Sequence, residues 1–182
     1  MHNDRIQNKR IRSGKQNIVG FAVLLLWACN GIAQDQKSDA SFDHLEPYTF
    51  EQIDHAEEVW EQQLSKEEFY ILRKKGTERA FSGDLLRVKD VGTYICSGCE
   101  LPLFHSSSKF KSGTGWPSFF IPLYSNCVGE ESDQSFSMVR TEVFCNRCGG
   151  HLGHVFDDGP PPTGLRYCIN SIALKFDPGS AN

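Results

Sequence analysis

Three features that would place this chain in other classes are scarce or missing. No stripe of lysine and arginine runs outside the N-terminus, and the formal net charge is -4, which argues against a nucleic-acid partner. No apolar run reaches the about 20 residues that a membrane-spanning helix needs. No repeat occurs except a doubled Cys-x-x-Cys. With 182 residues, 39% hydrophobic and 23% charged, the chain can form one soluble domain with its own core.

The N-terminus has the pattern of an export signal. Basic residues dominate the first 17 positions, and eleven apolar residues follow at 18–28, the length of a signal-peptide hydrophobic region. Leu26-Trp27-Ala28-Cys29 is similar to a bacterial lipoprotein cleavage box. We therefore predict a signal peptide at 1–28, lipid on Cys29, and export to the periplasmic side of a bacterial membrane. Cleavage after Ala33 is the alternative, and it also exports the protein.

Two helices are predicted at the start of the mature chain. Between Thr49 and Lys75, apolar residues recur at three- and four-residue steps, which is typical of amphipathic helices. The second helix begins at Ser65, where Glu68 completes a capping box, and stops at Gly76. We expect these helices to cover or support the rest of the domain and to carry no chemistry.

From Leu85 onward, the sequence pattern changes to short β-prone runs separated by Gly, Pro and Ser. The clearest predicted strands are Thr93–Cys96, Ser135–Cys145, Leu165–Ile169 and Ile172–Phe176. The fold class is therefore predicted as mainly β: a small antiparallel β-sheet domain with N-terminal helices. It occupies residues 46–182, after a polar, flexible tether at 29–45.

Four of the seven cysteines are predicted to hold a metal ion. Each of the pairs Cys96/Cys99 and Cys145/Cys148 places two thiols on a tight turn, and two such turns supply the tetrahedral shell that Zn²⁺ prefers. The ion would be structural, because four thiolates leave no open position for a water molecule. One disulfide within each pair is an alternative that export favours, and a thioredoxin-like redox centre is another.

Cys168 is the candidate nucleophile. In a strand, Arg166, Cys168 and Asn170 share one face, and a nearby cation lowers the pKa of a thiol. A half-buried strand cysteine packing as a small hydrophobe is the alternative. His151 and His154 lie in a glycine-rich stretch that we interpret as a turn. They are candidates for proton transfer, for metal binding or for ordinary surface positions.

Three further segments are rich in glycine, aromatic and polar residues: Gly113–Phe119, Gly150–Pro160 and Gly164–Ser171. Together with Gly76-Thr77-Glu78 and the doubled Cys-x-x-Cys, they resemble the B-type methionine sulfoxide reductases, which act on the R epimer of the sulfoxide. The similarity runs from about Leu64 to Phe176.

The resemblance implies a role for each candidate residue. Cys168 attacks the sulfoxide sulfur and becomes a sulfenic acid. The residues implied to line the active site are His151, His154 and Asn170, which orient a water or donate a proton. Trp116, rigidly set between Gly115 and Pro117, forms a wall for the substrate's methyl group. Asp158 holds Arg166. The substrates are oxidised proteins, and the enzyme is expected to be a monomer.

The sequence departs from this family at Thr114, where many relatives carry the cysteine that resolves the sulfenic acid. Two routes remain: Cys127, in a polar loop, forms a disulfide with Cys168, or a thioredoxin-like protein or small thiol reduces Cys168 directly. We favour direct reduction. Rival functions are a non-catalytic zinc-ribbon interaction module and another thiol oxidoreductase such as a peroxidase, which would need no aromatic methyl pocket.

Overall fold

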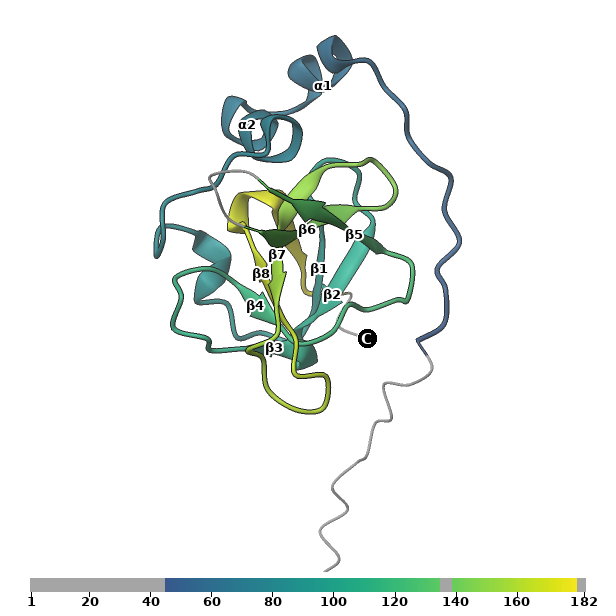
Figure 1. The fold of residues 1–182 in the computed structure, drawn as a ribbon. Coiled ribbons are helices and arrows are strands. Elements are labelled where there is room, and N and C mark those ends of the chain that lie inside the picture. Colours follow the sequence, from purple (N-terminus) through teal and green to yellow (C-terminus); the bar gives the residue numbers. More distant parts are fainter. Residues whose placement is uncertain (1–44, 135–138, 180–182) are drawn as a thin grey trace, which may run out of the picture. The chain divides into compact units, whose positions relative to one another are not determined.

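The computed structural model describes residues 45–134 and 139–179, which belong to one compact unit of the chain (Figure 1). The predicted signal peptide, Cys29 and nearly all of the predicted tether lie outside the described residues. Within the described ranges, no helix is both long enough and apolar enough to cross a membrane.

Two α-helices precede the sheets: α1 (Glu57–Gln63) and α2 (Lys66–Lys74). The predicted capping box of α2 is confirmed. The Ser65 hydroxyl accepts a hydrogen bond from the Glu68 backbone at 3.1 Å, and the Glu68 carboxylate accepts one from the Ser65 backbone at 2.9 Å. The predicted stop is off by one residue, since Lys75, not Gly76, takes the left-handed conformation that ends the helix (φ 53°).

The predicted start of the first helix at Thr49 is wrong. Residues 45–56 are not helical, because contacts with distant loops hold them. The Tyr48 backbone exchanges two hydrogen bonds with the Asn126 side chain, and the Ile53 N–H donates to the Arg147 carbonyl at 2.7 Å. Of the apolar face predicted for this helix, only Trp60 is buried.

The predicted fold class is confirmed: within the described residues, nine strands form two antiparallel sheets, whose arrangement Figure 1 shows. The three-stranded sheet has the order β2–β1–β9, with β1 at Thr93–Cys96, β2 at Pro102–His105 and β9 at Leu174–Asp177. The six-stranded sheet has the order β3–β4–β8–β7–β6–β5, with β3 at Lys109–Phe110, β4 at Ser118–Phe119, β5 at Val128–Asp133, β6 at Arg140–Cys145, β7 at His151–Phe156 and β8 at Arg166–Ile169. Short 3-10 helices lie at Asp84–Leu86 (η2), Ser106–Ser108 (η3) and Ser171–Ala173 (η5).

Three details of the strand prediction change. β6 begins at Arg140, and residues 135–138 of the strand predicted there lie outside the described part of the chain. The run predicted at 172–176 divides into η5 followed by β9. The glycine-rich stretch that carries both histidines is a strand, β7, and not a turn.

One aromatic core joins the two sheets. Tyr94 of β1 and Phe104 of β2 pack against Phe119 of β4, with ring centroids 4.9 and 4.4 Å from it, and Phe104 also contacts Tyr167 of β8 at 5.8 Å. These side chains are nearly fully buried, and burying each contributes about 1.5–3 kcal/mol. Since Tyr167 points into this core, its neighbour Cys168 points to the opposite face of β8.

Candidate active site and four-cysteine cluster

The four cysteines of the doubled motif form one buried cluster. Cys96 and Cys99 lie at the end of β1, Cys145 and Cys148 at the end of β6, and their sulfur atoms all lie within 4.8 Å of one another. The sulfur–sulfur distances given by direct contacts are 3.8 Å (Cys96–Cys148) and 3.5 Å (Cys99–Cys145). A tetrahedron of sulfurs each ~2.3 Å from Zn²⁺ has edges of ~3.8 Å, so the residues present fit that ion.

The sulfur atoms interact both within each turn and between the two turns. A cluster in which all four sulfurs lie close together suits a shared ion better than the alternative of one disulfide in each Cys-x-x-Cys. Neighbouring groups hold the turns in place: Arg73 of α2 donates to the Cys148 carbonyl at 2.8 Å, and Arg147 donates to the Cys99 carbonyl at 2.9 Å. The cluster therefore ties together the two sheets and the second helix.

Cys168 lies on β8 with its sulfur half-buried beside two polar partners. The Thr114 hydroxyl is 3.8 Å from the sulfur. Burial raises the pKa of the Cys168 thiol, and the hydrogen bond from Thr114 and the charge of Arg166 offset this only partly. Arg166 lowers this pKa as expected, but desolvation of the thiolate outweighs it, so the pKa of Cys168 is raised and not lowered.

Arg166 is held as predicted. Its guanidinium forms a two-point ion pair with Asp158, with Nε–Oδ1 at 2.7 Å and Nη2–Oδ2 at 3.0 Å. It also stacks over the Phe156 ring at 4.3 Å. Such a fork leaves the guanidinium little freedom, and so Arg166 presents a fixed positive charge beneath the sulfur of Cys168.

A β-bulge places the two histidines on the same face. Residues three apart on a regular strand face opposite sides, but the pairing of β6 with β7 shifts so that Val143 faces Gly153 while Phe144 faces His151. The extra residue, Leu152, restores a common direction. The imidazole centroids of His151 and His154 are consequently 5.5 Å apart.

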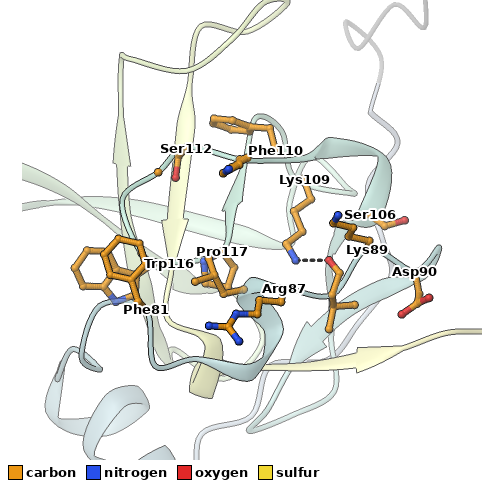
Figure 2. A pocket seen from close by; sticks show the side chains of 15 residues that line it. Phe81, Arg87, Lys89, Asp90, Ser106, Lys109, Phe110, Ser112, Trp116 and Pro117 are labelled. Carbon is orange, nitrogen blue, oxygen red and sulfur yellow. Dashed lines mark hydrogen bonds between the residues drawn. The ribbon is translucent and has the colours of Figure 1, made fainter.

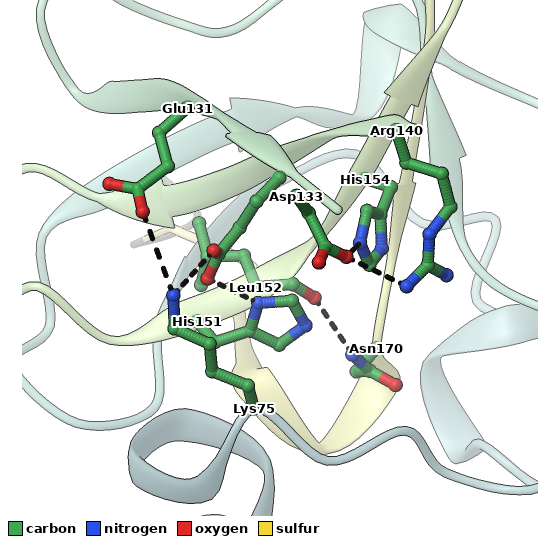
Figure 3. A network of polar contacts seen from close by, with 9 residues as sticks. Lys75, Glu131, Asp133, Arg140, His151, Leu152, His154 and Asn170 are labelled. Atoms are coloured by element: carbon green, nitrogen blue, oxygen red, sulfur yellow. Dashed lines mark hydrogen bonds and ion pairs between the residues drawn. The ribbon is translucent and has the colours of Figure 1, made fainter. Parts of the chain in front are cut away.

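Each histidine has a carboxylate partner, which in turn contacts a cation (Figure 3). His151 Nδ1 lies 2.8 Å from Glu142, whose other oxygen is 2.6 Å from Lys75. His154 Nε2 lies 2.8 Å from Asp133, and the same Asp133 oxygen is 2.7 Å from Arg140. These two chains fix the orientation of both rings.

His151 is buried and has one unpaired nitrogen. Burial lowers the pKa of His151, while Glu142 raises it, and burial prevails. In the neutral ring the proton belongs on Nδ1, because the Glu142 carboxylate can only accept a hydrogen bond. Its Nε2 is buried without a partner among the described residues. The pKa of Glu142 is lowered, since the hydrogen bonds from Lys75 and His151 outweigh burial.

Asn170 and Trp116 are fixed by the segment that follows α2. The Asn170 side chain donates to the Leu152 carbonyl and accepts from the Glu78 backbone, both at 3.0 Å. The Trp116 indole donates to the Glu78 carbonyl at 3.3 Å. The buried Glu78 carboxylate accepts from Ser171 N–H at 2.7 Å and anchors this segment to η5.

These side chains surround a small cavity of about 120 Å³, lined by Thr77, Trp116, Arg140, Gly153, His154, Phe156, Cys168 and Asn170. Its volume corresponds to about four water molecules, which is suited to a small group of a substrate. Four predicted residues line it, namely Trp116, His154, Cys168 and Asn170. His151 and Arg166 are not among the lining residues; both are buried and contact His154 and Cys168, respectively.

Sequence reasoning missed the carboxylates and cations that hold the histidines: Lys75, Asp133, Arg140 and Glu142. A signal was present, since the alternation Arg140-Thr-Glu142 in a predicted strand places both charges on one face. The role of Glu78 as an anchor was also missed.

Cys127 is not in an exposed polar loop as we expected from the sequence. It is fully buried, and its thiol contacts the carbonyls of Leu103 at 3.4 Å and Tyr124 at 3.2 Å. Burial raises the pKa of its thiol. Its core neighbours include Tyr167, which points away from the face that carries Cys168. Contact between the two sulfurs would require the core to open.

A β domain that presents one thiol beside a histidine, an amide and an indole, next to a four-cysteine cluster, has the organisation of a thiol-dependent oxidoreductase. The model of the SelR domain family matches residues 64–178. A curated relative from Leptospira interrogans (serogroup Icterohaemorrhagiae serovar Lai), named peptide methionine sulfoxide reductase MsrB, is 53% identical over 125 residues, which cover 69% of this chain and 95% of the relative. Proteins of the same name from Bradyrhizobium diazoefficiens and Thiobacillus denitrificans are 54% and 57% identical, over 71% and 65% of this chain and 94% and 90% of their own lengths. The chain belongs to the SelR domain family of B-type methionine sulfoxide reductases, as the sequence motifs predicted.

Proposed function

We propose that this protein reduces the R epimer of methionine sulfoxide in proteins to methionine, with Cys168 as the nucleophile. The observation that carries the proposal is the position of the Cys168 sulfur at a small cavity shared with Trp116, His154 and Asn170. Family membership supports the reaction class. A zinc-ribbon interaction module would need no such cavity.

The proposed chemistry begins at the two sulfur atoms. The Cys168 thiolate attacks the sulfoxide sulfur and forms a sulfur–sulfur bond. The protonated oxygen then moves to the Cys168 sulfur, and both its bond to the substrate sulfur and the sulfur–sulfur bond break. Cys168 is thereby oxidised to a sulfenic acid, and methionine leaves. The oxygen needs a proton during this step, and we assign its delivery to His154, which lines the cavity, with His151 behind it. Arg166 and Thr114 stabilise the Cys168 thiolate that attacks the sulfoxide.

Selection of one epimer follows from three fixed contacts to a chiral sulfur. Cys168 meets the sulfur, His154 lies on the side where the oxygen must receive a proton, and Trp116 offers its ring to the methyl group. Because the three positions cannot be exchanged, only one epimer places oxygen and methyl correctly at once. The assignment to the R epimer rests on the family resemblance.

Turnover of the two purified epimers of a dabsyl-labelled methionine sulfoxide tests this proposal. We expect reduction of the R epimer and at least about 100-fold slower reduction of the S epimer, equivalent to about 3 kcal/mol of discrimination. Equal rates for both epimers, or preference for S, would contradict the assignment of His154 and Trp116 to the oxygen and the methyl group.

Direct reduction by an external thiol is the proposed second half of the cycle. Thr114 cannot form a disulfide, and Cys127 is enclosed in the core. A thioredoxin-like protein or a small thiol would attack the Cys168 sulfenic acid, release water and form a mixed disulfide that a second thiol opens. Mass spectrometry after one equivalent of substrate, without reductant, distinguishes the routes: a persistent sulfenic acid supports direct reduction, and a Cys127–Cys168 disulfide overturns it.

Zn²⁺ is the proposed ion of the four-cysteine cluster, where it would brace the fold and take no part in the reaction. We also propose that the N-terminal residues export the protein to the periplasmic side of the membrane, with lipid on Cys29. The mass of the mature N-terminus distinguishes lipidation at Cys29 from cleavage after Ala33.

Exchange of Glu142 for glutamine is expected to lower turnover at pH 7 about tenfold. This loss is smaller than the whole rate contribution of a general acid, because the donor itself remains. Glu142 raises the pKa of His151, so the neutral amide lowers it further and reduces the protonated population behind His154. Activity that needs a protonated donor is lost as the pH rises through the pKa of that donor. The alkaline limb of the pH–rate profile should therefore move to lower pH, with little change in KM.

Glu131→Gln is the matched control. Glu131 pairs with the same Lys75, at 3.8 Å, but both side chains are mostly exposed, and Glu131 forms no ion pair with a histidine among the described residues. We expect this variant to keep wild-type turnover and an unmoved pH profile. If the two variants behave alike, Glu142 does not act through His151.

A further inference from the structure

A second, larger hollow adjoins the cavity at Cys168. It has a volume of about 810 Å³, and both hollows are lined by Trp116. Its walls come from Phe81 and from two stretches, 86–90 and 109–117 (Figure 2). The reaction proposed above uses none of these residues except Trp116 and its loop. We call this hollow the side groove.

An exposed aromatic ring stands at the edge of the side groove. Phe81 is 63% exposed and has a φ of 65°, a left-handed conformation that costs a bulky residue of order 1–3 kcal/mol. Its N–H donates to the Gly115 carbonyl at 2.8 Å, and a Cβ at Gly115 would lie 3.1 Å from the Phe81 ring. The segment is thus tied to the Trp116 loop, and Phe81 and Trp116 both line the side groove (Figure 2).

The side groove is positively charged. Arg87, Lys89 and Lys111 are exposed lining residues, and none forms an ion pair with any residue that the structure describes. Asp90 is the one acidic lining residue. Because the whole chain has a net charge of -4, this local excess of cations opposes the overall sign and would attract a negatively charged ligand.

A fourth cation, Lys109, affects the shape of the side groove more than its charge. Lys109 is half-buried and donates to the carbonyls of Leu85 at 2.5 Å and Val88 at 2.7 Å. It thereby fixes the loop that carries Arg87 and Lys89. The backbone that carries Arg87 and Lys89 is thus positioned before any ligand arrives, which reduces the entropy lost on binding.

We propose that the side groove binds the part of the substrate polypeptide next to the oxidised methionine and selects sequences with acidic side chains there. A methionine sulfoxide at Cys168 leaves its neighbouring residues at the cavity mouth, each advancing the chain by about 3.3–3.6 Å. The substrate's backbone and the apolar parts of its side chains would pack against Phe81 and Trp116. The substrate's carboxylates would be attracted by the positive charges of Arg87, Lys89 and Lys111. This inference rests on the proposed function and adds a substrate preference to it.

Peptides with a central R-configured methionine sulfoxide test the preference. One set carries three glutamates before the sulfoxide, a second set carries them after it, and matched sets carry glutamine instead. With dithiothreitol as the reductant, we expect one of the glutamate sets to have a KM about fivefold lower than its glutamine match, with a similar kcat. The advantage should shrink in about 0.5 M salt, since exposed charges are then screened within ~4 Å.

The combined variant Arg87→Gln, Lys89→Gln, Lys111→Gln should remove this advantage while leaving turnover of N-acetylmethionine sulfoxide unchanged. Its control is Lys66→Gln, Lys74→Gln, Lys175→Gln, which removes three exposed cations from α2 and β9. The control alters the net charge equally and should keep the peptide preference. Equal melting temperatures verify that both variants fold.

Three results would overturn the proposal. The glutamate and glutamine peptides have equal KM, or the control loses the preference as fully as the groove variant does. Alternatively, the groove variant keeps the peptide preference but loses activity only with a thioredoxin-like protein, which would assign the groove to the reductant. If the wild type reduces none of the R-configured peptides, the proposed function fails, which is a different outcome.

Discussion

Exchange of Cys168 for serine should reduce the rate of sulfoxide reduction by a factor of about 10⁴ or more. A serine hydroxyl is not ionised at neutral pH and cannot accept the substrate oxygen as a stable sulfenic acid. The side chain is half-buried at the cavity, and serine is slightly smaller than cysteine, so the fold should be retained. Turnover of the R epimer with dithiothreitol, beside the wild type, measures the effect.

The pH dependence of the wild type provides a second readout of the same atom. Because burial raises the pKa of the Cys168 thiol, the thiolate is a minor species at pH 7 in the free enzyme. The value of kcat/KM should therefore rise as the pH increases above 7, until the thiol is ionised or the proton donor is lost.

Cys127→Ala is the control for the nucleophile, since it removes the other cysteine outside the four-cysteine cluster in the described part of the chain. It should retain turnover with dithiothreitol. If Cys168→Ser keeps a tenth or more of the wild-type rate, or if Cys127→Ala is the inactive variant, the assignment of the nucleophile is wrong.

Removal of the Zn²⁺ proposed for the four-cysteine cluster should have the largest effect on stability. Structural Zn²⁺ binds zinc-finger peptides with apparent free energies of about 10–16 kcal/mol, which is comparable to the about 5–15 kcal/mol that stabilises a whole domain. Here the cluster joins the ends of β1 and β6 and docks α2 through Arg73. Cys148→Ser should therefore lower the melting temperature by at least about 15 °C or prevent folding.

Metal content and melting temperature, measured together, check this expectation. Elemental analysis should find one Zn²⁺ per chain in the wild type and in Cys127→Ala, and much less in Cys148→Ser. A wild type without metal whose intact mass shows disulfides under non-reducing conditions would establish the cysteine pairs as crosslinks instead. Unchanged stability after exhaustive chelation would show that the cluster does not brace the fold.

Local sequence signals predicted the features that depend on neighbouring residues. The capping box at Ser65 and Glu68 was predicted correctly, because both partners lie within one turn. The start of the first helix could not be predicted, since residues 45–56 are held by Asn126 and Arg147 from far along the chain. Tertiary contacts of that kind override a helical pattern that is only moderately amphipathic.

In the candidate active site, too, features set by neighbouring residues were predicted, and features set by distant contacts were not. The face shared by Arg166, Cys168 and Asn170 follows from strand alternation and was predicted. The common face of His151 and His154 depends on a bulge set by pairing with β6, and no local pattern indicates it. The pKa of Cys168 was misjudged for a related reason: the cations are visible in the sequence, whereas desolvation depends on how the strands pack.

The contact between β7 and β8 at Gly153 has a further consequence. A Cβ there would lie 2.0 Å from the Cys168 carbonyl oxygen, so the main chains of the two strands approach closely beside the directly paired residues His154 and Cys168. The separation between these two residues is thus set by the backbone of the paired strands as well as by side-chain torsions. Even the smallest chiral amino acid at position 153 would push the strands apart and increase the distance between His154 and Cys168.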